Sequence, residues 1–130
     1  MSESLTLKPY ELTFESRPGY LFAEIAYEKF NDTVAFDYMT EIAEKCRELN
    51  VARLLIERSG CEINSNIDSH RAVASFADMA PEGLAIAVVD TNESNRRRID
   101  FGARTAEKNT ITIRVFNNLA DAESWLITGS

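Results

Sequence analysis

Hydrophobic and polar residues alternate along the first part of the chain, as they do in half-buried β-strands. Leu12 and Phe14 are separated by polar residues, and the same period of two returns between Leu21 and Tyr27. The intervening Arg17-Pro18-Gly19 has the composition of a turn. Residues 9–29 are therefore predicted to form a β-hairpin with one face on the core.

The pattern then changes to a helical period, interrupted by two apolar runs. Residues 54–56 and 84–89 are apolar without alternation, which predicts strands buried on both faces of the sheet. A last strand, partly exposed to solvent, is predicted for residues 110–116. Helices are predicted for 32–50, 67–79, about 91–107 with Thr91 or Ser94 as its cap, and a short terminal segment capped by Asn117 or Asn118. The expected inward residues are Val34, Phe36, Met39, Ile42, Ala43, Cys46 and Leu49 in the first helix, Val73, Phe76, Ala77 and Ala80 in the second, Ile99, Gly102, Ala103 and Ala106 in the third, and Leu119, Ala122, Trp125 and Leu126 in the last.

The predicted element order is ββαβαβαβα, an α/β fold with a mixed, mostly parallel sheet. The hairpin supplies an antiparallel edge, the crossovers between parallel strands are right-handed, and helices pack against the sheet. With 130 residues, the chain is expected to form a single domain over residues 1–130.

Composition narrows the function classes. Net charge is −7, which argues against a nucleic-acid partner because phosphate binding needs clustered Lys and Arg. No apolar run reaches the roughly 18 residues of a membrane span. The acidic, polar start of the chain has no signal-peptide pattern. We therefore expect a cytoplasmic, bacterial-looking protein with reduced thiols, without a metal or cofactor.

Polar residues follow the predicted buried strands, where the carboxyl ends of a parallel sheet form a binding rim. The candidates for this rim are Asn31, Asp32, Arg58, Ser59, Cys61, Asn64, Ser65, Asp90, Asn92 and Asn117. Within it, an anion or small ligand could be bound by Arg58, Ser59, Gly60, Asn64 and Ser65. The alternative is that these side chains only cap helices and fill loops, as polar residues commonly do there.

The sequence contains little that indicates catalysis or metal binding. His70 is the single histidine, and its spacing from Cys61 matches no zinc pattern. No Gly-x-Ser-x-Gly elbow presents a serine nucleophile. The chain is expected not to be an enzyme, although Cys61 as a nucleophile is the alternative that stays open.

The triple arginine 96–98 is the only basic cluster. Arg97 and Arg98, with Phe101 beside them, are candidates for an interaction surface toward an acidic partner or a lipid headgroup. The alternative is a solvated helix face on which these arginines pair with residues such as Asp100 at i, i+4 spacing.

The closing segment from Val115-Phe116 through Asn117-Asn118 to Trp125-Leu126 resembles the end of small bacterial STAS/SEC14-like proteins of unknown function. The element order is the one shared by STAS domains, the fold of the bacterial anti-sigma-factor antagonists. This resemblance implies a regulatory or protein-interaction domain without enzymatic activity. It also implies a protein partner, and a homodimer is one expected state of the domain. The CRAL-TRIO lipid carriers share the sheet, so a small-molecule or lipid binder is the alternative function.

In regulatory STAS proteins, a serine that follows an aspartate at the start of a helix is phosphorylated. Asp68-Ser69 is similar to that pair when an insertion of about three residues is allowed, and ungapped alignment places Ser65 there instead. His70-Arg71 replaces the Gly-Leu that usually follows. The resemblance therefore makes Ser65 and Ser69 the phosphorylation candidates.

Overall fold

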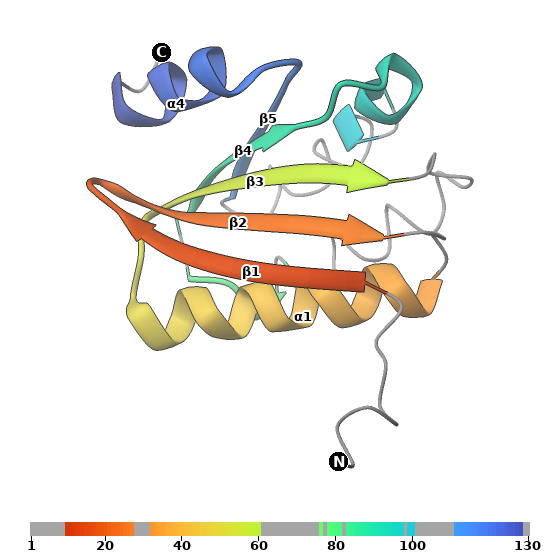
Figure 1. The fold of residues 1–130 in the computed structure, drawn as a ribbon. Helices are drawn as coiled ribbons and strands as arrows, with labels where there is room; N and C mark the ends of the chain where they lie inside the picture. Colours follow the sequence, from red (N-terminus) through yellow and green to blue (C-terminus); the bar gives the residue numbers. More distant parts are fainter. Residues whose placement is uncertain are drawn as a thin grey trace.

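Five strands form one sheet in the order β1-β2-β3-β4-β5 in the computed structural model (Figure 1). The structure describes residues 10–27, 32–60, 76, 78–81, 83–97, 99–100 and 111–128. The strands are β1 (Tyr10–Arg17), β2 (Tyr20–Tyr27), β3 (Arg53–Gly60), β4 (Ala85–Val89) and β5 (Thr112–Phe116). Sequence order and spatial order are the same, so each strand lies beside its predecessor.

The sheet is antiparallel only between β1 and β2. Pro18 and Gly19 make the connecting turn, and Gly19 has a φ of +88°, which favours glycine. The β2–β3, β3–β4 and β4–β5 pairs are parallel. The predicted mixed sheet is thus confirmed, with β3 and β4 as adjacent interior strands.

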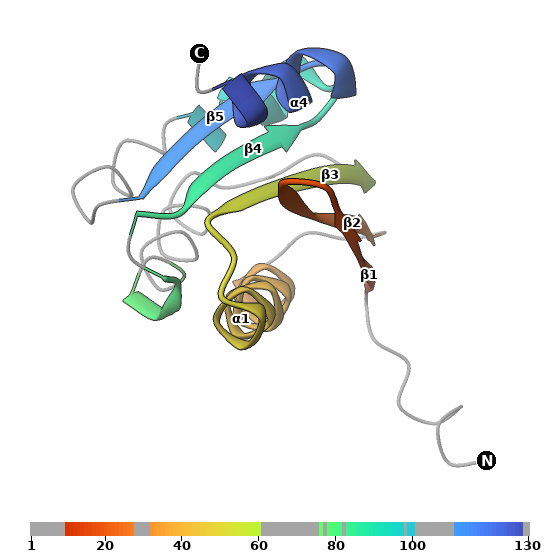
Figure 2. The same cartoon turned by 90° about the vertical axis from the view of Figure 1, so that its left-hand side faces the viewer.

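Helices cover both faces of the sheet. Figure 2 shows α1 (Asp32–Leu49) on one face and α4 (Leu119–Thr128) on the other. Asn50 ends α1 with a φ of +53°, and the N–H of Val51 donates to the carbonyl of Cys46 over 3.2 Å. Such a left-handed residue followed by a bond back into the last turn is a Schellman end. Among the described residues, no helix is both long and apolar enough to cross a membrane.

Two apolar clusters fill the space between these layers. On the α1 face, Leu21, Ile25, Leu54, Ile56, Ile86, Val88 and Ile113 pack with Tyr38, Ile42, Cys46 and Phe76. On the α4 face, Tyr20, Phe22, Leu55, Ala87 and Val89 pack with Ala122 and Leu126. Neighbouring residues of one strand thus enter opposite clusters, as the period of two requires. The inward positions predicted for Ile42, Cys46 and Phe76 are confirmed.

Burial differs from the expectation at three positions. The predicted core face of the hairpin is confirmed by Leu21 and Ile25, but Phe22 on the other face of β2 is also buried, at 6% exposed, in the cluster on the α4 face. Leu49 and Leu119, assigned to inward helix faces, are 44% and 39% exposed. Each lies at the end of its helix, where the neighbouring layer no longer covers it.

Tyr20 joins the hairpin to α4. Its hydroxyl donates to Glu123 Oε2 over 2.7 Å. Burial, and then this bond, raise the pKa of the Tyr20 phenol. Tyr20→Phe should lower the free energy of unfolding by about 1 kcal/mol, the usual net value of one such bond. Urea denaturation measures this loss. Glu123→Gln, which keeps an acceptor, should cost less, and the reverse order would contradict the assignment.

Cys46 is fully buried against the sheet, and burial raises the pKa of its thiol to about 12. The unfolded chain loses this proton near the ordinary value of 9. Stability should therefore fall as pH rises from about 9 to 12, because only the unfolded state ionises there. In a Cys61→Ser variant, Cys46 should resist alkylation at pH 8 until the protein unfolds. Rapid alkylation of the folded protein would contradict the burial, and Cys46→Ala should flatten the alkaline loss.

Candidate functional site

The carboxyl ends of the parallel strands form the rim at which the arrowheads of β2 and β3 end in Figure 1. Arg58 lies near the end of β3, and Asp90 follows directly after β4. Glu57 pairs with Val89 across these strands, so Arg58 and Asp90 occupy the next positions of the same register. Their side chains meet on the α1 face, because Ile56 and Val88, two residues earlier, belong to the cluster there.

Arg58 and Asp90 form a buried ion pair. Arg58 Nη1 lies 2.5 Å from Asp90 Oδ2, and the two side chains are 4% and 7% exposed. The same oxygen accepts a bond from Asn95 Nδ2 at 3.1 Å, and Oδ1 accepts one from the N–H of Asn92 at 2.9 Å. Because several donors satisfy the carboxylate, its charge can be held away from water.

The backbone of Asp90 is held as firmly as its side chain. Its N–H donates to the carbonyl of Phe116 in the next strand over 3.1 Å, and its own carbonyl accepts a bond from Arg96 Nη1 at 2.9 Å. Arg58, Asp90, Asn92, Asn95 and Arg96 are called the Asp90 network below. The network ties the ends of β3, β4 and β5 to the helical turn 93–97.

Asn92 begins this helical turn. Its Oδ1 accepts a bond from the N–H of Asn95 at 2.9 Å, which is the geometry of an N-cap. The prediction that Thr91 or Ser94 caps the helix is wrong, since Asn92 carries the capping bond. The spacing Asp90-x-Asn92 was a usable signal, because Asp and Asn side chains often bond to the backbone two or three residues on.

The surface outside the network carries exposed polar residues. Thr91, Glu93, Ser94 and Arg97 are exposed, and together they are called the rim surface below. Arg97 Nη2 lies 3.2 Å from Glu93 Oε2, with the two side chains 79% and 71% exposed. An ion pair in such contact with water contributes little to stability. These charges are therefore available to a partner, while the backbone beneath them is fixed.

The functional residues predicted from the sequence for ligand binding, catalysis, phosphorylation and partner contact fall into three groups. Arg58 is engaged with Asp90, so an external anion would have to compete with an internal carboxylate. Ser59 is exposed beside it, and Gly60 ends β3. Outside the described residues lie Asn31, Cys61, Asn64, Ser65, Ser69, His70, Arg98 and Phe101.

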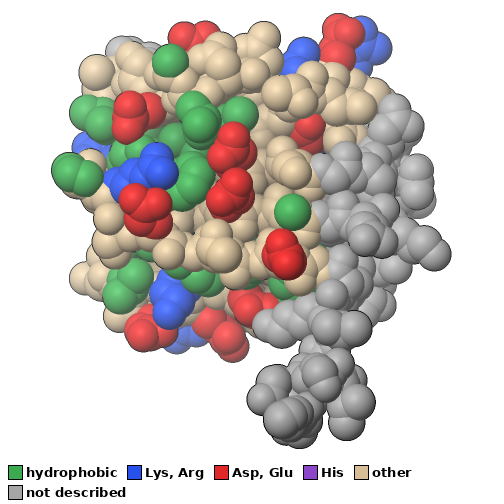
Figure 3. Space-filling model, in the orientation of Figure 1, with side chains coloured by type: hydrophobic (Ala, Val, Ile, Leu, Met, Phe, Trp, Pro, Cys, Tyr) green, Lys and Arg blue, Asp and Glu red, His purple; other side chains and the backbone are tan. Residues whose placement is uncertain are grey.

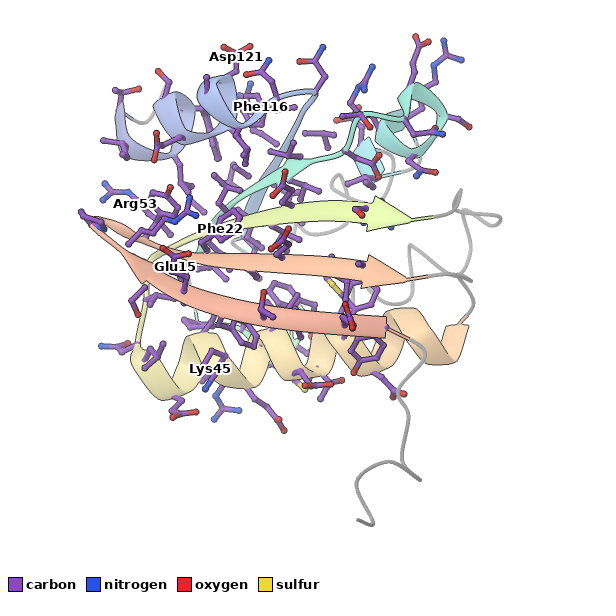
Figure 4. The ribbon with its side chains drawn as sticks, viewed as in Figure 1. Glu15, Phe22, Lys45, Arg53, Phe116 and Asp121 are labelled. Carbon is purple, nitrogen blue, oxygen red and sulfur yellow. The ribbon has the colours of Figure 1, made fainter. Side chains whose placement is uncertain are left out.

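The second predicted cap at this end of the sheet is confirmed. Asn118 Oδ1 accepts a bond from the N–H of Asp121 at 2.8 Å and so caps α4. Its Nδ2 donates to Asn117 Oδ1 at 2.8 Å, and Figure 4 labels Asp121 on this helix, with Phe116 just before it. In the described part of the chain, no three His, Cys, Asp or Glu side chains gather in a group that could hold a metal ion.

Comparison with solved structures identifies the fold. The chain is similar to the crystal structure of an anti-sigma factor antagonist from Mycobacterium paratuberculosis, with a TM-score of 0.63. The likeness covers 90% of this chain and 93% of that one, at 16% sequence identity. The STAS-like fold expected from the element order is therefore confirmed. No protein-family model matches the sequence. No curated protein matches it.

Proposed function

We propose that this protein is a regulatory domain without enzymatic activity, which binds a partner protein through the rim surface. The observation that carries the proposal is the Asp90 network directly beneath that surface. The likeness to an anti-sigma factor antagonist supports a regulatory role of this kind. We also propose that this protein acts in the cytoplasm, with its acidic composition as support.

The energetics of the network favour a role in orientation. A buried ion pair gains little over a well-packed apolar pair, because both charges must be taken out of water. Here, however, the pair and its amide donors fix the start of a helical turn against three strand ends. Rigid placement of exposed side chains lowers the entropy lost when a partner binds. This supports the rim surface as the contact area.

Quantitative affinity purification from the native host tests the proposal, with the tagged chain expressed at its natural level. Arg97→Glu should reduce the recovery of a specific partner at least tenfold, since an exposed interface charge is reversed. Arg53→Glu is the matched control: Arg53 is also exposed, but it begins β3 at the opposite end of the strand. Equal recovery with both variants, or no specific partner with the unchanged chain, would argue against this surface.

Phosphorylation would regulate the binding of the partner protein. We propose Ser65 and Ser69 as its sites, on the similarity to regulatory STAS proteins described above. A phosphate adds about −1.5 to −2 charges near the start of the helix predicted for residues 67–79 and would change how a partner binds the rim surface. Intact-mass analysis of protein from the native host should show an added phosphate that disappears in the Ser65→Ala, Ser69→Ala double variant. If protein from the native host never carries a phosphate, phosphorylation does not regulate partner binding.

A further inference from the structure

The outer edge of β1 faces no other strand in the part of the chain that the structure describes. Among the described strands, β1 pairs with β2 and with no other. It is eight residues long, and Glu11, Thr13, Glu15 and Ser16 are exposed along it. An open edge of this length can accept another strand through its backbone groups, unless side chains prevent it. Figure 3 shows the face that carries β1, with acidic and basic side chains next to apolar ones.

The turn determines which backbone groups point outward. Arg17 pairs with Tyr20 across Pro18-Gly19. A two-residue turn closes on a pair that exchanges hydrogen bonds directly, and Pro18 is compatible with this turn because its missing N–H takes no part in that pair. Such pairs recur at every second residue, so the odd-numbered positions of β1 bond to β2. The N–H and C=O groups left facing away from the sheet are those of Leu12, Phe14 and Ser16.

The side chains of β1 divide by face. Leu12 and Phe14 pack toward the α1-side cluster, and Lys45 Nζ lies 5.6 Å from the centroid of the Phe14 ring. The odd-numbered residues therefore lie on the α4 side, with Arg17 Nε 3.3 Å from Glu15 Oε2. Figure 4 labels Glu15 and Phe22 at this hairpin end of the sheet. The edge thus carries a carboxylate at Glu11 and a guanidinium at Arg17, on one face.

We propose that two copies of this chain associate through their β1 edges, antiparallel, with the twofold axis at Phe14. This register pairs the outward backbone groups of Phe14 with each other and those of Leu12 with Ser16 of the second copy. It also sets Glu11 of each copy opposite Arg17 of the other, on the same face of the joined sheet. Opposite charges at facing positions stabilise a strand pair, and the twofold symmetry produces this contact at two places in the dimer.

The charged side chains of β1 favour this register over the alternative with the twofold axis at Thr13. Moving the axis to Thr13 also satisfies the outward backbone groups, but it sets Glu11 opposite Glu15 of the second copy, twice. Facing like charges destabilise a strand pair. With the axis at Phe14, Arg17 faces Glu11 of the second copy, in addition to its own contacts with Glu15 and with the Phe22 ring, whose centroid lies 3.9 Å from Arg17 Cζ. The Phe14 rings meet on the α1 side and cover each other's partly exposed surface.

This interface goes beyond the proposed function and can fail independently of it. The dimer test needs only the purified chain, whereas the partner test needs the rim surface, which follows β4 in the chain. Sedimentation velocity in 150 mM salt, from about 1 to 200 µM, should show a reversible monomer–dimer equilibrium, with long-range repulsion between two chains of net charge −7 largely screened. A monomer over this whole range would overturn the proposal.

A proline variant tests the edge. Ser16→Pro removes an outward N–H without removing a bond to β2, and proline is tolerated at such edge positions. The dimer should be lost while circular dichroism stays unchanged, and Ser16→Ala should keep the dimer. Dimerisation that survives in a folded Ser16→Pro variant would show another interface.

A charge-exchange pair tests the register and does not depend on the proline variant. Glu11→Arg alone and Arg17→Glu alone should each weaken self-association about tenfold, since each places like charges opposite one another. An equimolar mixture of the two variants restores opposite charges at both contacts and should form a heterodimer. If both variants self-associate as the unchanged chain does, or the mixture does not associate, the register is overturned.

Discussion

Asp90→Ala should lower the free energy of unfolding by about 3–5 kcal/mol, the range for removing one partner of a buried ion pair. The variant leaves the Arg58 guanidinium, 4% exposed, without its carboxylate. It also removes the acceptor of the Asn95 amide and of the Asn92 N–H. The loss can be measured as the shift in the urea midpoint at constant slope.

A matched control separates burial from charge. Arg97→Ala also breaks an ion pair, with Glu93, but both side chains are largely exposed. We expect a change within about 0.5 kcal/mol there. If Asp90→Ala cost no more than Arg97→Ala, the buried network would not be present in solution.

The same pair of residues also separates stability from orientation. The double variant Arg58→Met, Asp90→Leu replaces the ion pair by apolar residues of similar size, which is often neutral or stabilising. It should therefore recover most of the stability lost in Asp90→Ala. It should not recover partner binding, because the apolar pair cannot hold Asn92 and Asn95 in place. Full binding by a stable double variant would contradict the proposed role of the network.

The second large effect is expected at α4. Leu126→Ala should cost about 2–5 kcal/mol, because a buried leucine is removed and a cavity remains. Leu126 is 2% exposed in the cluster on the α4 face of the sheet. Ala122 is the only other α4 residue buried there among those described. Few side chains of α4 itself could therefore close the cavity.

The neighbouring residue supplies the control. Ile127 is 48% exposed, so Ile127→Ala should change stability by no more than about 0.5 kcal/mol. Both substitutions lie in α4 and remove a similar side-chain volume, so the two positions differ mainly in how far the side chain is buried. Comparable losses at the two positions would mean that α4 does not dock as described. Thermal unfolding can confirm the order, since 2–5 kcal/mol lowers the melting temperature of a chain this size by several degrees or more.

Periodicity determined much of the fold because each pattern has a local cause. The unbroken apolar runs in β3 and β4 allowed no solvated face, so both strands had to lie inside the sheet. The Pro18-Gly19 turn set the hairpin, and the helical spacing of Ile42 and Cys46 identified the buried side of α1. The rim also followed, because the carboxyl ends of parallel strands always lie together.

Contacts between distant segments were not readable from local patterns. The sequence predicted one core face for the hairpin. Tyr20 and Phe22 on the other face are buried as well, because the cluster built around α4, about a hundred residues later, reaches them. In the same way, Arg58 looked like a free cation at a rim. Only the pairing of β3 with β4 brought Asp90 against it.

The sequence by itself determined the element order, the interior position of β3 and β4, and the edge at which polar residues collect. Those features depend on spacing along one segment, where side-chain period and backbone geometry are linked. Only the tertiary structure decided which face of β2 was covered, which asparagine capped the turn after β4, and which carboxylate neutralised Arg58. Those outcomes depend on register between segments far apart in the chain, and a register is set by packing over the whole sheet.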